Sequence, residues 1–300
     1  MEYGSIADIA KKHGARISYN EIIAPYTSFN IGGVCDVIVV PNSAECICEI
    51  VSECREKGIR YYFLGKCTNI LVSDDGLRGV VIIAGGDYNS VRREGNDLIC
   101  DAGASLTRIC NTAKNESLTG MEFAYGIPGS AGGGLYMNAG AFGGEMKDVV
   151  LYCDYLDTDG SIKRMGKEEM QLSYRHSIFT GTDRIILSVC FELEPGVKDE
   201  IAAKMNDIMQ RRRDKQPLEY PSAGSTFKRP DGAFAARLIQ DSGLKGYVVG
   251  GAQVSEKHSG FVINRGGATC DDVCRIIDDI KEKVYADSGI QLECELIKMG

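Results

Sequence analysis

From Pro41 onward, the apolar positions of the chain alternate between a helical period and short continuous runs. A segment that starts at the capping residue Ser43 and stops at Gly58 carries its apolar residues on one helical face: Ile47, Ile50, Val51 and Cys54. Ser105 can cap a second helix. Short apolar runs predict buried strands at 61–64, 70–72 and 80–84. This alternation is typical of α/β and α+β folds.

The second half of the chain contains a hairpin pattern and changes in character near residue 200. Apolar residues 149–156 run into Asp157-Thr158-Asp159-Gly160, where the Asp-Gly pair accommodates positive φ angles. The remaining patterns predict a strand at 184–193, a helix at 196–213, a helix at 233–241, a strand at 261–263, a helix at 271–287 and a strand at 291–297. In the last strand, alternation places Glu293 and Glu295 on the same face. We predict two domains, residues 1–200 and residues 201–300.

The composition describes an acidic chain without membrane character. In 300 residues, 34 Lys plus Arg against 42 Asp plus Glu give a net charge of −8, which argues against a general nucleic-acid binder. No apolar stretch reaches the ~18 residues of a membrane span, and the start of the chain lacks the apolar region of a secretory signal. We expect a cytoplasmic protein with neither a nucleic-acid nor a membrane partner.

The chain has twelve cysteines, mostly at positions where a small apolar residue would fit. We therefore expect buried thiols rather than a disulfide framework. Cys270 and Cys274 fall on one helical face, but two thiols without further ligands make a poor zinc site. We expect no metal.

Glycine accounts for 36 of the 300 residues, and two segments with glycine could hold a ligand, one with a single glycine after a predicted strand and one with five glycines in nine residues. The first is Gly65-Lys66-Cys67-Thr68-Asn69, and residues 126–134 read Gly-Ile-Pro-Gly-Ser-Ala-Gly-Gly-Gly. Backbone without Cβ atoms can turn several N–H groups toward one anion, and a helix that begins at Ser130 would add its dipole. The alternative is that these glycines serve tight turns and close packing. The spacing excludes a Rossmann fingerprint, whose sixth position would be Met137, and the P-loop pattern is absent.

Six segments carry a family resemblance, in this order along residues 26–300: YTSFNIGG, FLGKCTNILV, GIPGSAGGGLYMNAGAFGGE, SYRHSIF, PSAGSTFKRP and GIQLECELIKMG. Together they resemble the UDP-N-acetylenolpyruvoylglucosamine reductases of bacterial peptidoglycan synthesis, in the shorter subtype that lacks a substrate-covering tyrosine loop. The resemblance implies an α+β fold. It consists of a vanillyl-alcohol-oxidase (PCMH)-type FAD-binding region of two α/β subdomains, at about residues 25–195, followed by a C-terminal α+β substrate-binding domain.

The reaction of that family is the NADPH-dependent, FAD-mediated reduction of UDP-GlcNAc enolpyruvate to UDP-N-acetylmuramate. The resemblance thus implies non-covalent FAD as the cofactor, with NADPH and UDP-GlcNAc enolpyruvate as partners. Hydride addition to the vinyl carbon leaves negative charge beside the substrate carboxylate, which calls for a cation and a proton donor. By their places in the motifs, Arg175 matches the cation, Ser225 the proton donor and Glu295 the third catalytic residue.

The two glycine segments and the flanking motifs also indicate the ligand contacts. Those for FAD are Gly65, Lys66, Cys67, Thr68, Asn69, Gly126, Ser130, Gly132, Gly133 and Asn138; those for the substrate are Tyr174, Lys215 and Arg229. Thr226 is a competing hydroxyl beside Ser225, and periodicity alone does not separate Glu295 from Glu293. Cys67 stands where the family usually has glycine. It is either a tolerated small residue or an exposed thiol of low pKa beside the flavin.

Two other functions fit parts of the sequence. An FAD oxidase or dehydrogenase of the same fold would act on another substrate. The segments around Arg175, Ser225 and Glu295 count against it, because together they suit carboxylate activation and protonation. A catalytically silent module would only bind flavin or a UDP-sugar, and a bound flavin that NADPH cannot bleach would indicate it.

Overall fold

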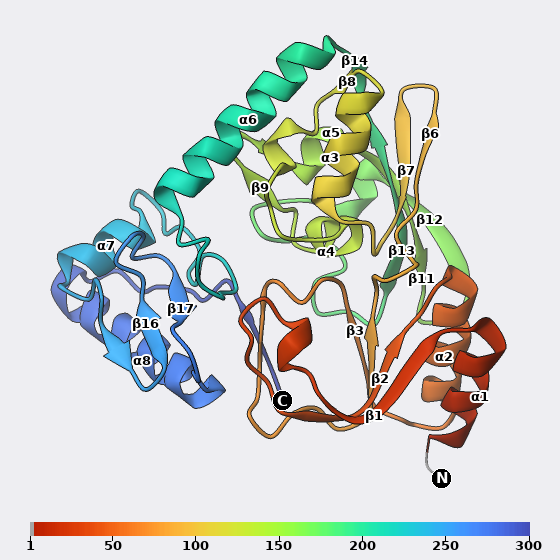
Figure 1. The fold of residues 1–300 in the computed structure, drawn as a ribbon, viewed down its shortest axis with the longest axis horizontal. Coiled ribbons are helices and arrows are strands. Elements are labelled where there is room, and N and C mark those ends of the chain that lie inside the picture. Colours follow the sequence, from red (N-terminus) through yellow and green to blue (C-terminus); the bar gives the residue numbers. More distant parts are fainter. Residues whose placement is uncertain (1–2) are drawn as a thin grey trace. The chain divides into compact units, whose positions relative to one another are not determined.

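The computed structural model describes residues 3–300 and contains two compact units (Figure 1). The described part of unit 1 comprises residues 3–19, 37–66 and 79–211, and unit 2 comprises residues 20–36, 67–78 and 212–300. Each unit has its own hydrophobic core, and the mixture of helices and strands is that of an α+β fold, as predicted. Both units combine separated parts of the chain. The predicted division at residue 200 follows the linear order and stays a prediction.

The first layer of unit 1 is a four-stranded sheet covered by two helices. The strand order is β1-β2-β5-β3, and β2 and β3 both run parallel to β5. The elements are α1 (Gly4–His13), β1 (Arg16–Ile22), β2 (Val34–Val40), α2 (Ala44–Glu56), β3 (Tyr61–Leu64) and β5 (Val80–Ile83). Figure 1 shows α1 and α2 side by side on this sheet. Ser43 caps α2, and the buried face of α2 contains the four residues predicted for it, which confirms that helix.

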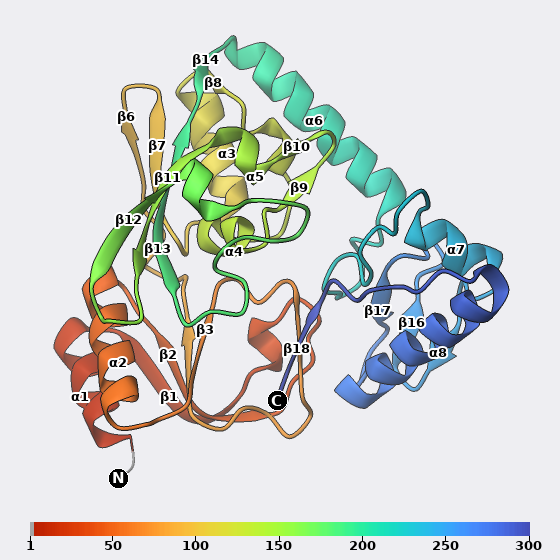
Figure 2. The same ribbon diagram turned by 180° about the vertical axis from the view of Figure 1, so that it is seen from behind.

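The second layer of unit 1 is a five-stranded antiparallel sheet in the order β12-β11-β13-β7-β6 (Figure 2). Its strands are β6 (Val91–Glu94), β7 (Asp97–Asp101), β11 (Val150–Leu156), β12 (Ile162–Gly166) and β13 (Ile185–Glu192). The predicted hairpin is confirmed, because Leu156 pairs with Ile162 and Gly160 takes a φ of 82° in the turn between them.

Further helices and strand pairs complete unit 1. The helices are α3 (Leu106–Asn115), α4 (Ala131–Tyr136), α5 (Met146–Val149) and α6 (Lys198–Lys215), with the 3-10 turns η2 (Glu122–Ala124) and η3 (Lys167–Met170). The strand pairs are β8 (Leu118–Thr119) with β14 (Glu194–Pro195), and β9 (Gly140–Ala141) with β10 (Gly144–Glu145). Ser105 caps α3 as predicted, and α6 continues from unit 1 into unit 2 at Arg212.

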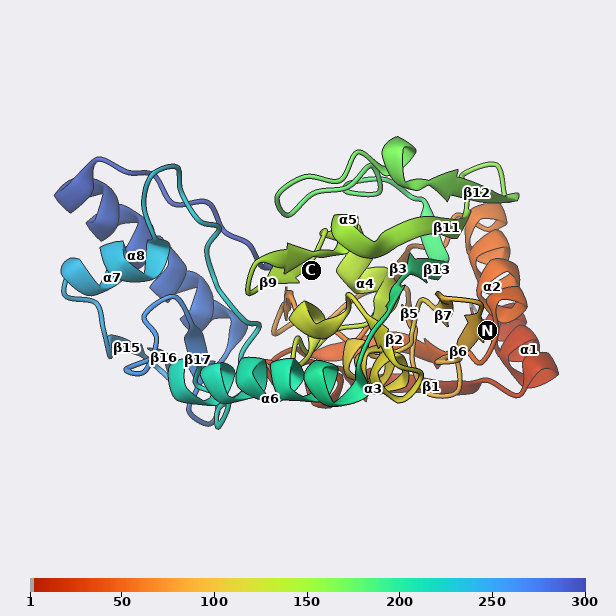
Figure 3. The same cartoon turned by 90° about the horizontal axis from the view of Figure 1, so that it is seen from above.

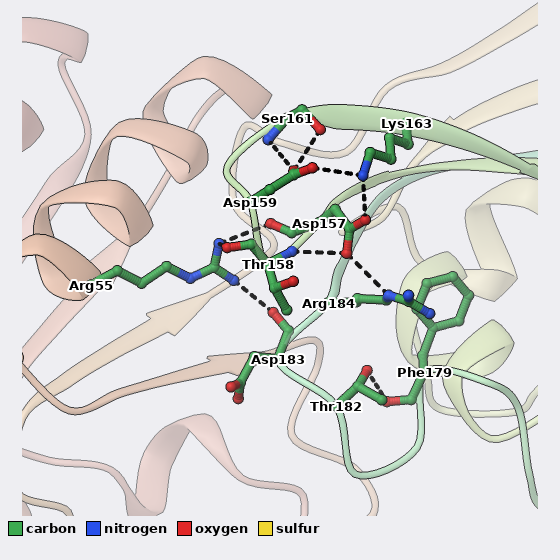
Figure 4. A network of polar contacts seen from close by, with 10 residues as sticks. All are labelled: Arg55, Asp157, Thr158, Asp159, Ser161, Lys163, Phe179, Thr182, Asp183 and Arg184. Carbon is green, nitrogen blue, oxygen red and sulfur yellow. Dashed lines mark hydrogen bonds and ion pairs between the residues drawn. The ribbon is translucent and has the colours of Figure 1, made fainter.

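A polar network around Asp157 joins α2 to the hairpin of the second sheet (Figure 4). The Arg55 guanidinium, from α2, donates to the main-chain oxygens of Asp157 at 2.9 Å and of Asp183 at 2.7 Å. The Asp157 carboxylate accepts from Lys163 at 2.7 Å and from Arg184 at 3.1 Å. The hydrogen bond from Lys163, followed by that from the Thr158 amide, lowers the pKa of Asp157 to about 2. The two layers of unit 1 are thus connected by polar contacts in addition to apolar packing.

Unit 2 is a small sheet backed by a long helix. Its elements are η1 (Ala24–Tyr26), β4 (Ile70–Val72), α7 (Ala235–Asp241), β15 (Val248–Val249), β16 (Ala252–Val254), β17 (Val262–Asn264), α8 (Cys270–Ser288) and β18 (Ile297–Met299). The antiparallel sheet β15-β16-β17 packs against α8, which Figure 3 shows running alongside it. Asp74 accepts hydrogen bonds from the first amides of α8, those of Cys270 and Asp271, at 2.8 and 3.1 Å.

The predicted strand at 291–297 is wrong. Only Ile297–Met299 form a strand, which pairs in parallel with β4, and the preceding residues make a single isolated bridge, between Phe227 and Cys294. The neighbouring segment offers little pairing: the Lys228 N–H donates to Glu293 O and the Glu295 N–H donates to Thr226 O, both at 2.9 Å. These two hydrogen bonds make one bridge and no ladder. Glu293 and Glu295 therefore do not share a strand face: Glu293 is exposed and Glu295 is half-buried.

None of the twelve cysteines forms a disulfide, and all except Cys48, Cys274 and Cys294 are buried. Within residues 3–300, no three His, Cys, Asp or Glu side chains are grouped so that they could hold a metal ion. None of the helices described in this part of the chain is both long and apolar enough to cross a membrane.

Candidate functional site

Gly65, the first residue of one glycine segment, lies against Ser130 of the other, and both residues belong to unit 1. A Cβ atom on Gly65 would lie 2.5 Å from Ser130 Oγ, so glycine is needed at this close approach. Ser130 caps α4, because its hydroxyl accepts a hydrogen bond from the Gly133 N–H at 3.3 Å. The predicted helix start at Ser130 is confirmed. The end of β3 and the start of α4 are thus adjacent.

The amides at the start of α4 are already used inside the protein. The N–H of Ala131 donates to Ala104 O at 2.8 Å, that of Gly132 donates to Ala102 O at 2.9 Å, and that of Gly133 reaches Ser130 Oγ. The anion nest that the sequence suggested here is therefore not formed by these three groups. A phosphate at this helix end would have to displace an existing hydrogen bond.

The glycines of α4 differ from one another in their surroundings. A Cβ on Gly132 would lie 2.8 Å from Ala102 Cβ, so Gly132 is buried and closely packed against the turn that follows β7. Gly133 is exposed, and a Cβ there would meet only Ser130 Oγ, at 3.3 Å. Gly126 has a φ of 80°, which a turn in the left-handed region requires. Of the candidate FAD contacts on α4, Gly133 is thus the one whose surface is open.

Cys67 is buried in unit 2 and has a left-handed backbone conformation. Its φ is 51°, which costs roughly 1–2 kcal/mol for a residue with a Cβ atom, and its side chain is 4% exposed. Burial raises the pKa of its thiol to about 12. The alternative of an exposed thiol of low pKa is therefore wrong, and Cys67 is a small buried residue at a position suited to glycine.

The two residues after Cys67 have main-chain N–H groups without an acceptor in the described part of the protein. Among residues 3–300, no acceptor is found for the N–H of Thr68 or of Asn69. Lys66, which precedes Cys67, has an exposed side chain. Amides without protein acceptors in a tight turn are suited to an anionic ligand such as a diphosphate. In this respect the loop fits the FAD that the sequence resemblance implies.

Arg175 lies at the tip of a tight turn in unit 1. Ser173 and His176 exchange two main-chain hydrogen bonds of 3.1 Å, which leaves Tyr174 and Arg175 between them. Arg175 has a φ of 55°, and its guanidinium donates to Gly140 O at 3.3 Å and lies 5.0 Å from the Tyr174 ring. Tyr174 is half-exposed. The turn thus presents a cation and an aromatic ring together.

Asn138 anchors this turn through hydrogen bonds of its side chain. Its side chain is fully buried, and its Nδ2 donates to Ser173 O at 3.0 Å and to Glu145 Oε2 at 2.7 Å. Its Oδ1 accepts from the Lys147 N–H at 2.9 Å. Its polar side-chain atoms are thus engaged within the protein, and the contact of Asn138 with FAD stays a prediction.

Ser225 and Thr226 are clearly distinguished by their surroundings in unit 2. Ser225 is exposed and bridges Phe261, whereas Thr226 is buried at 2% exposure. The Thr226 hydroxyl accepts from the Val262 N–H at 3.1 Å. Thr226 is therefore a structural hydroxyl, and Ser225 is the one of the two that is accessible to a ligand.

Hydrogen bonds of its own main-chain atoms hold Glu295 beside Thr226, which follows Ser225, and beside Asn69. The Glu295 N–H donates to Thr226 O at 2.9 Å, and Asn69 Nδ2 donates to Glu295 O at 3.2 Å. The exposed Glu293 instead forms an ion pair with Lys228. The structure thus distinguishes the two acids, which strand periodicity could not do. Glu293 is exposed and paired with Lys228, and Glu295 is half-buried.

The candidate substrate cations lie on the surface of unit 2. Lys215 is exposed at the end of α6, and Arg229 is exposed with its guanidinium 4.0 Å from the Phe234 ring. Arg212, in the middle of the Arg211–Arg213 run, is instead buried and donates to Gln216 Oε1 at 3.4 Å. Sequence analysis missed this burial, because a run of three arginines carries no sign of which one faces inward.

The predicted residues thus form two groups. In unit 1, Gly65 lies against Ser130, and Asn138 holds the turn that carries Tyr174 and Arg175. In unit 2, Asn69, Ser225 and Glu295 are on adjoining segments. The convergence of Arg175 with Ser225 and Glu295 stays a prediction.

Two family models match the chain. The model described as "FAD binding domain" matches residues 35–166, and the model described as "UDP-N-acetylenolpyruvoylglucosamine reductase, C-terminal domain" matches residues 216–299.

Curated relatives and a solved structure extend the similarity over nearly the whole chain. The UDP-N-acetylenolpyruvoylglucosamine reductase of Clostridium novyi (strain NT) is 47% identical over 284 residues, which cover 95% of this chain and 92% of the relative. The protein of the same name from Caldanaerobacter subterraneus subsp. tengcongensis is 47% identical over 285 residues, covering 95% and 94%. The crystal structure of UDP-N-acetylenolpyruvylglucosamine reductase from Thermus caldophilus matches with a TM-score of 0.83 at 30% identity, over 95% of this chain and 100% of that one.

Proposed function

The chain belongs to the UDP-N-acetylenolpyruvoylglucosamine reductases, a family of FAD-dependent oxidoreductases, and on that premise we propose that it reduces UDP-GlcNAc enolpyruvate to UDP-N-acetylmuramate with NADPH. This reaction belongs to the synthesis of peptidoglycan precursors. The observation that carries the proposal is the environment of Ser225, which is exposed beside a segment that fixes Glu295, while the competing hydroxyl of Thr226 is buried.

FAD is the cofactor that the proposed chemistry needs. When bound, it accepts a hydride from NADPH and supplies one to the vinyl carbon of the substrate. Gly65, Gly133 and the amides of Thr68 and Asn69 are the residues proposed to hold it. The attachment is proposed to be non-covalent. Cys67 is buried and its raised pKa keeps it protonated, which supports this part of the proposal.

Arg175 is proposed to bind the carboxylate of the enolpyruvyl group. Hydride addition to the vinyl CH2 places negative charge on the carbon that bears this carboxylate, as in an enolate. A guanidinium stays charged at neutral pH and can form two parallel hydrogen bonds to a carboxylate. Its contribution would grow as the charge develops, so it would stabilise the transition state more than the bound substrate.

Ser225 is proposed to donate the proton that completes the reduction. Its O–H bond breaks as a C–H bond forms at the carbon beside the carboxylate, and the serine oxygen then regains a proton from solvent. The exposure of Ser225 supports this return path, since Lys228 is engaged with Glu293. Glu295 is proposed as the third catalytic residue. Tyr174, Lys215 and Arg229 are proposed to bind the rest of the substrate, the two cations at its diphosphate.

The experiment is stopped-flow measurement of the flavin absorbance, first with NADPH and then with UDP-GlcNAc enolpyruvate. We expect Ser225→Ala to be reduced by NADPH at the wild-type rate, and its reoxidation by the substrate to slow by about 100-fold or more, the low end for a positioned acid. Ser222→Ala is the matched control, because Ser222 makes its hydrogen bonds to Ser28 through main-chain atoms.

Three outcomes would contradict the proposal. Equal loss in both steps would remove Ser225 from the donor role. A wild-type flavin that NADPH bleaches and the enolpyruvyl sugar fails to reoxidise would indicate an oxidoreductase with another substrate. A flavin that NADPH cannot bleach would indicate a binding module.

A further inference from the structure

The Tyr174–Arg175 turn is held from one side by the segment that follows α4. Ser177 Oγ donates to Tyr136 O at 2.6 Å, Asn138 Nδ2 donates to Ser173 O at 3.0 Å, and Arg175 donates to Gly140 O. All of these residues belong to unit 1. Residues 136–140 thus hold the turn at three places: at Ser173 before it, at Arg175 in its tip and at Ser177 after it.

Asn138 is the centre of this arrangement. It is fully buried and has a φ of 45°, a left-handed conformation that asparagine adopts more readily than most residues. Its amide orientation is fixed by its partners: two acceptors, Glu145 Oε2 and Ser173 O, face the NH2 group, and one donor, the Lys147 N–H, faces the oxygen. A flipped amide would lose all three hydrogen bonds. The side chain therefore has one arrangement only.

We infer that Asn138 is a positioning residue that sets the direction of the Arg175 guanidinium. Ser173 O, which Asn138 binds, also accepts from the His176 N–H and so closes the turn that carries Arg175. Through Glu145, whose β10 position pairs with Gly140 in β9, Asn138 also supports the strand that offers Gly140 O to Arg175. The contact at Ser173 O and the contact at Gly140 O thus both lead back to the buried side-chain amide of Asn138. The inference rests on the proposed function of Arg175.

The test is a double-mutant cycle between Asn138→Gly and Arg175→Ala in the FAD-loaded protein. Glycine keeps the positive φ and removes only the side chain. We expect Asn138→Gly to slow flavin reoxidation by UDP-GlcNAc enolpyruvate by about 10–100-fold, as for a misplaced catalytic group, with reduction by NADPH unchanged. Because Asn138 acts through Arg175, the double variant should be no slower than Arg175→Ala alone. Independent, additive losses would overturn the inference.

Hydrogen exchange supplies a readout that does not depend on activity. The amides of Ser173 and His176 are paired with each other in the turn, so their exchange should accelerate in Asn138→Gly. Unchanged exchange at these amides would also overturn the inference. Ser43→Ala is the control for general destabilisation: it removes the cap of α2, costs about 1 kcal/mol, and should leave both readouts as in the wild type.

A second variant guards against a failure of Asn138→Gly to fold. Asn138→Asp keeps the shape and the acceptor for the Lys147 N–H but loses both donations, so it should also slow reoxidation and accelerate exchange. Failure of the proposed function is distinguishable. If the substrate does not reoxidise the wild-type flavin, the function and this role of Asn138 fall together; if it does and the losses are additive, the inference alone falls.

Discussion

The two glycine segments differ in the structure in how their main-chain amides are used. Around α4, Gly132 is packed against Ala102 and the first amides of the helix are used within the protein. In the loop after β3, Cys67 has a left-handed backbone conformation although it is not glycine. The N–H groups of Thr68 and Asn69 have no acceptor among the described residues. A cluster of glycines therefore does not by itself mark a ligand cradle. Main-chain amides without an acceptor in the protein are a better indicator of a ligand site than the number of glycines.

The largest effect that would sharpen this comparison concerns the Cys67 thiol. With a pKa raised to about 12, Cys67 should react with iodoacetamide at pH 8 about 10³-fold more slowly than in the denatured chain, because so little thiolate is present. Mass spectrometry of the labelled peptides measures the rate, and the partly exposed Cys274 is the internal control. Fast labelling of Cys67 in the folded protein would break the description of this loop.

The pKa of Cys67 also predicts a sign for the pH dependence of stability. The folded protein holds this proton more tightly than the unfolded chain, whose thiol ionises at about 8.5. The contribution of Cys67 to stability is thus complete below that pH and is lost as the pH rises toward about 12. Cys67→Ala should reduce the loss of stability between pH 9 and 11, measured by urea denaturation at each pH, by comparison with the wild-type chain.

The next effect separates two neighbouring glycines of α4. Gly132→Ala forces a Cβ to 2.8 Å from Ala102 and should destabilise the fold by about 1–3 kcal/mol, measured by denaturant unfolding of the apoprotein. Gly133→Ala meets only Ser130 Oγ and should leave stability unchanged or slightly higher. If Gly133 lies under the cofactor, its variant should bind FAD about tenfold more weakly in a fluorescence titration. Equal stability losses in the two variants would contradict the distinction.

The smallest effect is that of Cys67→Gly. Relief of the left-handed strain is offset by the greater freedom of glycine in the unfolded chain and by the lost burial of the sulfur, so stability should change by less than about 1 kcal/mol. FAD should bind as tightly or more tightly. Cys67→Ala, the control, loses the sulfur without the relief and should be the less stable of the two. A large loss of FAD affinity in Cys67→Gly would give the thiol a role that its burial does not suggest.

Much of the fold could be predicted because its elements carry local signals. Ser43, Ser105 and Ser130 each cap a helix where the capping preference places one, and the Asp-Gly hairpin forms at the expected turn. The strand at 291–297 was wrong for a non-local reason. Its alternating pattern suits a strand, but the segment beside it pairs with it only at the Phe227–Cys294 bridge, so no ladder forms.

The residues of the candidate site were selected from motifs, and their roles stay predictions. The motifs selected Ser225 and Glu295, and the structure gives physical grounds for preferring them to Thr226 and Glu293. Asn138 was placed at FAD because it lies in a glycine-rich motif. Its contacts with Ser173 and Glu145 join positions that are far apart in sequence, and no local pattern reports such a connection.

The pairing of β4 with β18 has a consequence for how the protein is made. A ribosome synthesises residues 70–72 long before residues 297–299. The loop at Thr68 and Asn69 leads into β4, and among the described residues 3–300 the only strand that pairs with β4 is β18, which is made last. Asn69 also waits for Glu295, whose carbonyl it binds. Nascent chains should therefore emerge before the loop at Thr68 and Asn69, which is proposed to hold FAD, is complete, and loading with FAD should follow translation rather than accompany it.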